Sequence, residues 1–178
     1  MIPRRIHVMA PTRGTGGLPD EQWAEDWSLK LFGYVRMARG VFPFMRAQGG
    51  GRIINIVGIT ARNPVPGYLA GGMANAALVN FTKGLADLGA ASGILVNAVS
   101  PGDTATSRWD AHVGRLAAAE GRTAEAVRRD REGAYPLGRI GTPDDVAAVV
   151  RFLASRAAAF VTGICVTVDG GSTRGVYP

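Results

Sequence analysis

The sequence predicts an α/β fold, a doubly wound parallel sheet with helices on both faces, and two observations carry this prediction. Short apolar runs occur at 53–57, 94–99 and 164–168; they are rich in β-branched residues, apolar on both faces and too short for helices. Helical patterns separate them, so the order is helix, strand, helix, strand, helical insert, helix, strand. Such alternation is typical of parallel strands joined by right-handed crossovers, whose chemistry lies at their carboxyl ends.

Four segments are expected to be helical. The first opens at Pro19 and Asp20, and Pro43 is expected to bend or end it. The second has an apolar stripe and Gly89 as its C-cap; the stripe comprises Ala74, Ala77, Leu78, Phe81, Leu85 and Leu88. Residues 106–131 form a polar helical region, with Trp109 and Leu116 as anchors, and are read either as a lid or as a solvated helix pair. Thr142 is the N-cap of the last helix, which buries Val146, Val149, Val150 and Leu153.

Composition predicts one soluble domain. Residues 1–18, rich in Pro, Gly, Arg and Thr, read as a loop or disordered lead-in, and residues 19–178 as a single domain. No apolar run is long enough for a membrane span and no signal peptide is recognisable. Cys165 is the only cysteine, so no internal disulfide forms, and we expect a cytoplasmic protein.

The charge pattern argues against two classes of function. The net charge is +6, but the arginines are scattered, and the densest cluster, residues 128–132, is interleaved with acids as on a solvated helix face. We therefore predict no nucleic-acid binding. His7 and His112 are isolated, without the spacing of a metal site or a catalytic triad, so no metal is predicted.

Four passages in order resemble the short-chain dehydrogenase/reductase family, over its C-terminal two thirds. They are Trp23 to Gly33 with Gly51 to Ile56, the helix from Asn75 to Lys83, Val96 to Gly102, and Pro136 to Pro143 running on to Gly171. The resemblance implies a Rossmann-like fold that lacks the N-terminal strands of the dinucleotide-binding half. Residues 13–17 contain glycines but lack the G-x-G-x-x-G spacing, so they read as a loop. A truncated gene, a late start codon or a fragment would give such a chain.

The family's four active-site positions are all replaced here. The family uses a Tyr as acid/base, a Lys that lowers its pKa and holds the ribose, a Ser that binds the substrate oxygen, and an Asn that anchors a water. Aligning Asn55 and Lys83 puts other residues at these positions: Gly71 for the Tyr, Asn75 for the Lys, Gly58 for the Ser and Lys30 for the Asn.

Two hypotheses follow from these replacements. In one, the site is inactive, because glycines transfer no proton and Asn75 supplies no cation. In the other, the site is rearranged: Lys30 and Asn75 exchange the family's Asn and Lys, Tyr68 brings its phenol to the room left at Gly71, and Thr60 offers the hydroxyl that Gly58 lacks. The catalytic candidates are therefore Tyr68, Lys30, Asn75 and Thr60.

The cofactor candidates lie in the turn after the second strand. In the family this turn meets the nicotinamide carboxamide, which needs both a donor and an acceptor. The matching residues here are Pro101, Gly102, Thr104 and Thr106. The implied cofactor is NAD or NADP.

The resemblance implies an NAD(P)-dependent oxidoreductase that acts on a small carbonyl or alcohol. The alternative is a non-catalytic remnant that serves as an oligomerisation or scaffold module. Helices 20–45 and 68–89 match those that form the dimer interface in the family, so a homodimer or homotetramer is expected. A non-redox lyase or isomerase is a third possibility, but no residue in the sequence supports it.

Overall fold

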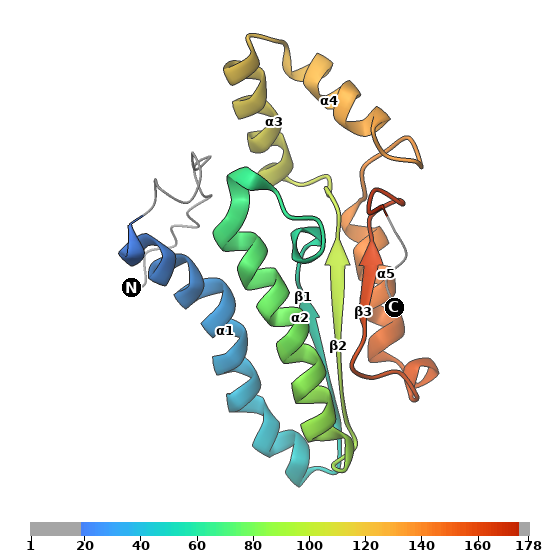
Figure 1. Cartoon of the computed structure of the whole chain (residues 1–178). Coiled ribbons are helices and arrows are strands. Elements are labelled where there is room, and N and C mark those ends of the chain that lie inside the picture. Colours follow the sequence, from blue (N-terminus) through green and yellow to red (C-terminus); the bar gives the residue numbers. More distant parts are fainter. Residues whose placement is uncertain (1–18, 175–178) are drawn as a thin grey trace.

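A three-stranded parallel sheet is the centre of the structure, a computed structural model that describes residues 19–174 (Figure 1). Its strands are β1 (Gly51–Ile56), β2 (Ile94–Pro101) and β3 (Cys165–Val168), in that spatial order. Asn55 lies opposite Ala98, which lies opposite Cys165. The three predicted strands are therefore confirmed, with ends that differ by one or two residues.

Helices cover both faces of the sheet, which confirms the doubly wound arrangement. Helices α1 (Asp20–Ala47) and α2 (Leu69–Ala90) lie on one face and α5 (Pro143–Ala154) on the other (Figure 1). Alternate residues of β2 point to opposite faces. Ala98 therefore packs with Leu78 of α2, whereas Val99 packs with Leu153 of α5.

The sequence predicted that Pro43 bends or ends α1. The prediction of an end is wrong, because the helix continues to Ala47. Phe42 and Met45, on either side of the proline, pack against Ile94 and Val96 of β2. This burial holds the last turn in place although proline removes one helical hydrogen bond.

Gly89 is not the C-cap of α2, since the helix ends at Ala90 and is capped by Ala91. Gly89 lies inside the last turn, where a Cβ would come within 2.9 Å of the carbonyl oxygen of Ile94. Gly89 therefore allows α2 to approach β2 closely; it does not form a left-handed turn. The apolar stripe that the sequence predicted for α2 is also too wide, because Ala77 is exposed and Leu88 is 62% exposed.

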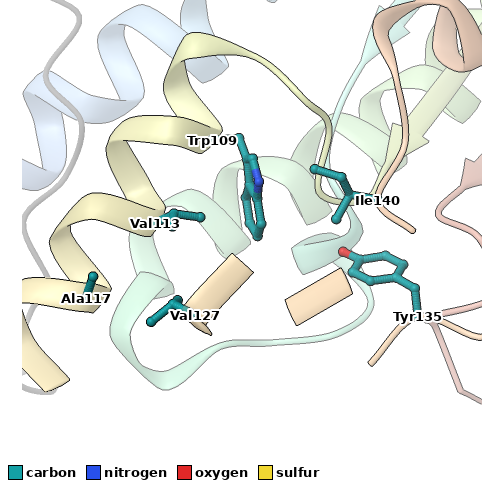
Figure 2. Packing of buried hydrophobic residues seen from close by; sticks show 6 residues of the cluster. All are labelled: Trp109, Val113, Ala117, Val127, Tyr135 and Ile140. Carbon is teal, nitrogen blue, oxygen red and sulfur yellow. The ribbon is translucent and has the colours of Figure 1, made fainter. Parts of the chain in front are cut away.

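Helices α3 (Ser107–Glu120) and α4 (Ala124–Gly133) lie beyond the carboxyl ends of the strands (Figure 1). Figure 2 shows their shared core, which comprises Trp109, Val113, Ala117, Val127, Tyr135 and Ile140. Trp109 is buried and Leu116 packs against this cluster, so both predicted anchors are confirmed. The segment has its own core at the edge of the sheet where the predicted site lies.

The start of α5 follows its sequence signals. Thr142 accepts a hydrogen bond from the backbone N–H of Asp145, whose carboxylate accepts one from the N–H of Thr142, a capping box. The predicted buried residues Val146, Val149, Val150 and Leu153 pack against β2 and β3.

Three short 3₁₀ turns complete the described part: η2 (Ile59–Ala61), η3 (Pro66–Tyr68) and η4 (Arg156–Ala158). No helix within residues 19–174 is long and apolar enough to cross a bilayer. The lead-in at 1–18, with His7 and the glycines at 13–17, lies outside the described residues. The division into that lead-in and a domain at 19–178 stays a prediction.

Candidate active site

Three glycines lie close to the candidate side chains: Gly58, after the carboxyl end of β1, and Gly71, in α2, each make room for one polar side chain, whereas Gly72 approaches the backbone of Thr60. A Cβ on Gly58 would lie 2.9 Å from the amide nitrogen of Asn75. A Cβ on Gly71 would collide with the ring of Tyr68, and one on Gly72 would lie 3.3 Å from the carbonyl oxygen of Thr60 and 4.0 Å from its Cβ. Gly71 and Gly58 are therefore spatially coupled to the side chains of Tyr68 and Asn75, whereas Gly72 lies against the backbone carbonyl of Thr60.

Asn75 and Thr60 form a direct pair. The amide Nδ2 of Asn75 donates a hydrogen bond of 2.7 Å to Oγ1 of Thr60. Asn75 is only 2% exposed, and within residues 19–174 its Oδ1 is buried without a hydrogen-bond partner. A buried acceptor without a partner costs free energy, so this oxygen is available to a donor on a ligand.

Tyr68 lies over the α-carbon of Gly71. Its hydroxyl oxygen is 2.5 Å from the point that a Cβ at position 71 would occupy. A tyrosine at 71 would instead carry its hydroxyl about 6 Å from that Cβ, by ordinary bond lengths. The ring thus fills the room left by Gly71, but its hydroxyl lies at least about 3 Å short of the family's phenol, roughly one hydrogen-bond length.

Lys30 faces the same region from α1. It lies between Trp27, whose indole N–H donates to the carbonyl of Ala70 at the start of α2, and Tyr34, whose hydroxyl donates to the carbonyl of Ile56 at the end of β1. Residues at i, i+3 and i+7 share one helix face. Lys30 is therefore directed between the end of β1 and the start of α2.

Lys30 is partly buried and feels the positive charge of Arg108. Burial, and then the guanidinium of Arg108, hold the pKa of Lys30 below its usual value. Within residues 19–174, Lys30 makes no hydrogen bond and no ion pair. The geometry therefore brings together Tyr68 with Gly71 and Asn75 with Thr60, but bonds Lys30 to none of them.

The turn after β2 is held by backbone bonds on one side. The N–H of Gly141 donates to the carbonyl of Asp103, and the N–H of Ala105 donates to the carbonyl of Gly141. This parallel bridge uses the groups on either side of Thr104, so the N–H and C=O of Thr104 itself point to the opposite side. That side offers a donor and an acceptor, which matches a carboxamide.

The other cofactor candidates have structural roles. Thr106 is the N-cap of α3, accepting from the N–H of Trp109, and its hydroxyl donates to the carbonyl of Thr104. Gly102 packs closely against Asp169 rather than leaving open space, since a Cβ at position 102 would lie 3.0 Å from the Cβ of Asp169. Pro101 ends β2 opposite Val168.

Tyr135 supports this turn and was not singled out by the sequence. Its hydroxyl accepts a hydrogen bond of 3.0 Å from the N–H of Asp103. Burial is the main reason that the pKa of Tyr135 is raised to about 12. The only sequence signal is its place just before the Pro136 to Pro143 motif, which gives no hint of a contact across 32 positions.

Comparison with known proteins agrees with this fold. Residues 7–173 match the family model described as enoyl-(acyl carrier protein) reductase. A 4-formylbenzenesulfonate dehydrogenase from Comamonas testosteroni is 33% identical over 93% of this chain and 66% of its own length. An acetoacetyl-CoA reductase from Rhizobium meliloti is 37% identical over 85% of this chain and 58% of its own.

Solved structures agree as well. The L-sorbose reductase of Gluconobacter frateurii, complexed with NADPH and L-sorbose, superposes with a TM-score of 0.87 at 30% identity, covering 94% of this chain and 64% of that one. The chain belongs to the short-chain dehydrogenase/reductase family of oxidoreductases. It spans 56–66% of the length of the first curated relatives it matches.

Proposed function

We propose that the protein interconverts a small carbonyl compound and its alcohol, with NAD or NADP as the hydride carrier. The observation that carries this proposal is the coupling of Gly71 with Tyr68 and of Gly58 with Asn75, which donates a hydrogen bond to Thr60. Glycines that remained after an active site was lost would leave empty space. Here the space at Gly71 holds the phenol of Tyr68, and the space at Gly58 holds the amide of Asn75. The relatives are named as dehydrogenases and reductases, and none of them supports the scaffold alternative.

The nicotinamide end of the cofactor fits the turn at 101–106. The N–H and C=O of Thr104 face away from Gly141 and suit the carboxamide. When bound, a nicotinamide supplies or accepts the hydride at the substrate carbon. The L-sorbose reductase is complexed with NADPH, whereas a structurally similar xylitol dehydrogenase is bound to NAD⁺. Neither decides the preference here.

Tyr68 is the proposed proton donor and acceptor. Its hydroxyl makes no hydrogen bond within residues 19–174, so it is available to a substrate oxygen or to one bridging water. The shortfall from the family's phenol position is at least about 3 Å; at that lower limit one water spans it, and general acids act through a single water as well as directly. Asn75, oriented by Thr60, offers its unpartnered Oδ1 to a donor group on the ligand.

Turnover of NADH and NADPH with a panel of ketones and aldehydes tests the proposal, followed by absorbance of the reduced nicotinamide. We expect turnover by the wild type. In Tyr68→Phe the rate should fall by about 10²-fold or more, which is the usual contribution of an acid/base group. Full activity in Tyr68→Phe would contradict the role of this phenol. Absence of turnover across the panel in a sample that binds the cofactor would contradict the function.

A second copy of the chain is the proposed partner. Large apolar side chains are exposed on helices α1 and α2, which match the segments predicted for the interface: Leu29, Phe32, Met37, Phe44, Met73 and Leu88. A shallow hollow of about 410 Å³, lined by Trp23, Trp27 and Met73 among others, continues this face. Light scattering tests the assembly: Met37→Lys is expected to shift the mass toward the monomer, whereas Phe152→Lys, on α5 at the other face of the sheet, serves as the control.

A further inference from the structure

The turn after β3 is organised by one carboxylate. Asp169 directly follows Val168, the last residue of β3. Its Oδ2 accepts hydrogen bonds from the N–H of Thr173, at 2.7 Å, and from the hydroxyl of Ser172, at 3.1 Å. Its Oδ1 accepts a hydrogen bond of 3.0 Å from the N–H of Gly171. The position of Thr173 is therefore set by the end of the sheet, although Thr173 lies outside any helix or strand.

Thr173 contacts the loop that carries Thr60. Its Oγ1 accepts a hydrogen bond of 2.8 Å from Nδ2 of Asn63, which lies 110 positions earlier in the chain. Asn63 also closes the turn η2, because its N–H donates to the carbonyl of Ile59. Thr60 lies inside the turn that is closed in this way. A short 3₁₀ turn has poor hydrogen-bond geometry of its own, so the contact from Thr173 helps to fix where Thr60 lies.

Thr60 in turn holds Asn75 through the hydrogen bond of 2.7 Å from the Asn75 amide. A displacement of Thr60 therefore passes directly to the side chain whose buried Oδ1 has no hydrogen-bond partner within residues 19–174. Two side-chain hydrogen bonds and one closed turn thus connect Thr173 with Asn75.

The turn after β3 also contacts the cofactor side of the candidate site. The N–H of Gly102 donates a hydrogen bond of 3.0 Å to the carbonyl of Val168. A Cβ at position 102 would lie 3.0 Å from the Cβ of Asp169, so the two backbones approach closely. Residues 169–173 therefore contact both the turn proposed for the nicotinamide and the loop of Thr60.

We infer that Thr173 and Asn63 are positioning residues, which hold the pair of Thr60 and Asn75 in register with the cofactor turn. Reacting atoms must come within about 3–3.5 Å of each other, and a misplacement of about 1 Å can cost about 10²-fold in rate. One turn that contacts both sides of the site fixes their separation directly. That this separation serves hydride transfer rests on the proposed function, whereas the positioning of Asn75 by Thr173 does not depend on it.

Three variants of the turn test this inference. Thr173→Val removes the hydroxyl at nearly the same shape and keeps the N–H that donates to Asp169. Thr173→Ser retains a hydroxyl and is the conservative variant. Ser172→Ala is the matched control, because it removes a hydrogen bond to Asp169 from the same turn and leaves the contact between Thr173 and Asn63 in place.

NMR of the Asn75 side-chain amide, in the full chain without cofactor, measures the positioning. Its N–H signals are assigned by their loss in Asn75→Asp. We expect these signals to shift in Thr173→Val, because Thr60 moves relative to the amide that donates to it. They should stay close to the wild-type values in Thr173→Ser and in Ser172→Ala.

Steady-state kinetics measures the consequence for the reaction. In Thr173→Val kcat should fall about tenfold with the KM of the cofactor nearly unchanged, and Thr173→Ser should restore most of it. Asn63→Ala should lower kcat little further in the Thr173→Val background, because the two residues act through one hydrogen bond. Ser172→Ala should lower the thermal midpoint and leave kcat unchanged, which separates positioning from stability of the turn.

Two results overturn the inference: unchanged Asn75 signals in Thr173→Val, or full kcat in Thr173→Val while circular dichroism shows the variant folded. An equal fall of kcat in Ser172→Ala would overturn it as well, since any loosening of the turn would then have the same effect. A shift of the Asn75 signals in Thr173→Val, without carbonyl turnover by the wild type, would contradict the proposed function alone.

Discussion

The ring of Tyr68 lies where the Cβ of residue 71 would be, so Gly71 and Tyr68 occupy one shared space in the candidate site. The two positions are therefore coupled, and a side chain at 71 excludes the present position of the phenol. This relationship favours a rearranged site over an inactive one, and it yields a direct structural test.

Gly71→Ala should destabilise the protein by about 1–3 kcal/mol, the usual cost of overpacking a filled space. Tyr68→Ala should remove most of this penalty in a double-mutant cycle, because the colliding ring is gone. Urea unfolding measures both effects. Gly84→Ala is the matched control in the same helix: nothing lies within 4 Å of its Cβ position, and it should stabilise by about 0.5–1 kcal/mol. Additive effects of the Gly71 and Tyr68 changes would contradict the shared space.

The pair between Asn75 and Thr60 predicts that Thr60→Val lowers the free energy of unfolding by about 1–3 kcal/mol, because a buried amide donor loses its acceptor. Thr60→Ser keeps the hydroxyl and is the control. Chemical denaturation followed by circular dichroism distinguishes them. Equal stability of the valine and serine variants would mean that the 2.7 Å hydrogen bond contributes nothing.

Lys30→Met tests whether the lysine replaces the family's lysine as the group that tunes the phenol. If it does, kcat should fall and its pH profile should shift in the variant. Steady-state kinetics of the wild type and the variant across pH measure both effects. An unchanged kcat with an unchanged pH profile would contradict this role.

Tyr135 predicts a loss of stability in strong alkali. Its pKa is raised from 10.0 to about 12 in the folded protein, mainly by burial, so the folded state retains a proton that the unfolded state releases. This pKa shift contributes to the free energy of unfolding, and its contribution is complete below pH 10. As the pH rises from about 10 toward 12 the contribution is lost, by at most about 1.4 kcal/mol per pH unit.

The measurement for Tyr135 is urea unfolding at several values between about pH 9 and 12, compared with Tyr135→Phe. The variant is less stable at neutral pH, since the N–H of Asp103 loses its acceptor, but it should lack this part of the alkaline decline. Parallel curves for the two proteins would contradict the raised pKa.

The alternation of apolar runs and helices sufficed to predict the sheet, because a strand buried on both faces leaves a local pattern such as 94–99. The errors at Pro43 and Gly89 have another cause. Both were read by local rules for helix ends, whereas packing of Phe42 and Met45 and the close approach of Gly89 to Ile94 decided the outcome.

For the candidate site the sequence proposed positions but not the contacts between them. A gap-free register identified Gly58, Gly71 and Asn75 from the sequence. The fit of Gly58 to Asn75 and of Gly71 to Tyr68 depends on distances in the folded chain, which no spacing rule contains. Tyr135 could not be predicted for the same reason, because its bond to Asp103 joins residues far apart in the chain.

The most direct test of the central claim is a titration of the folded chain with NADH and NADPH, followed by nicotinamide fluorescence and thermal shift. We predict saturable binding by the wild type and by Thr104→Val, and much weaker binding by Thr104→Pro, which removes the backbone N–H directed away from Gly141. Absence of saturable binding by a folded sample, or equal binding by the proline variant, would contradict the claim.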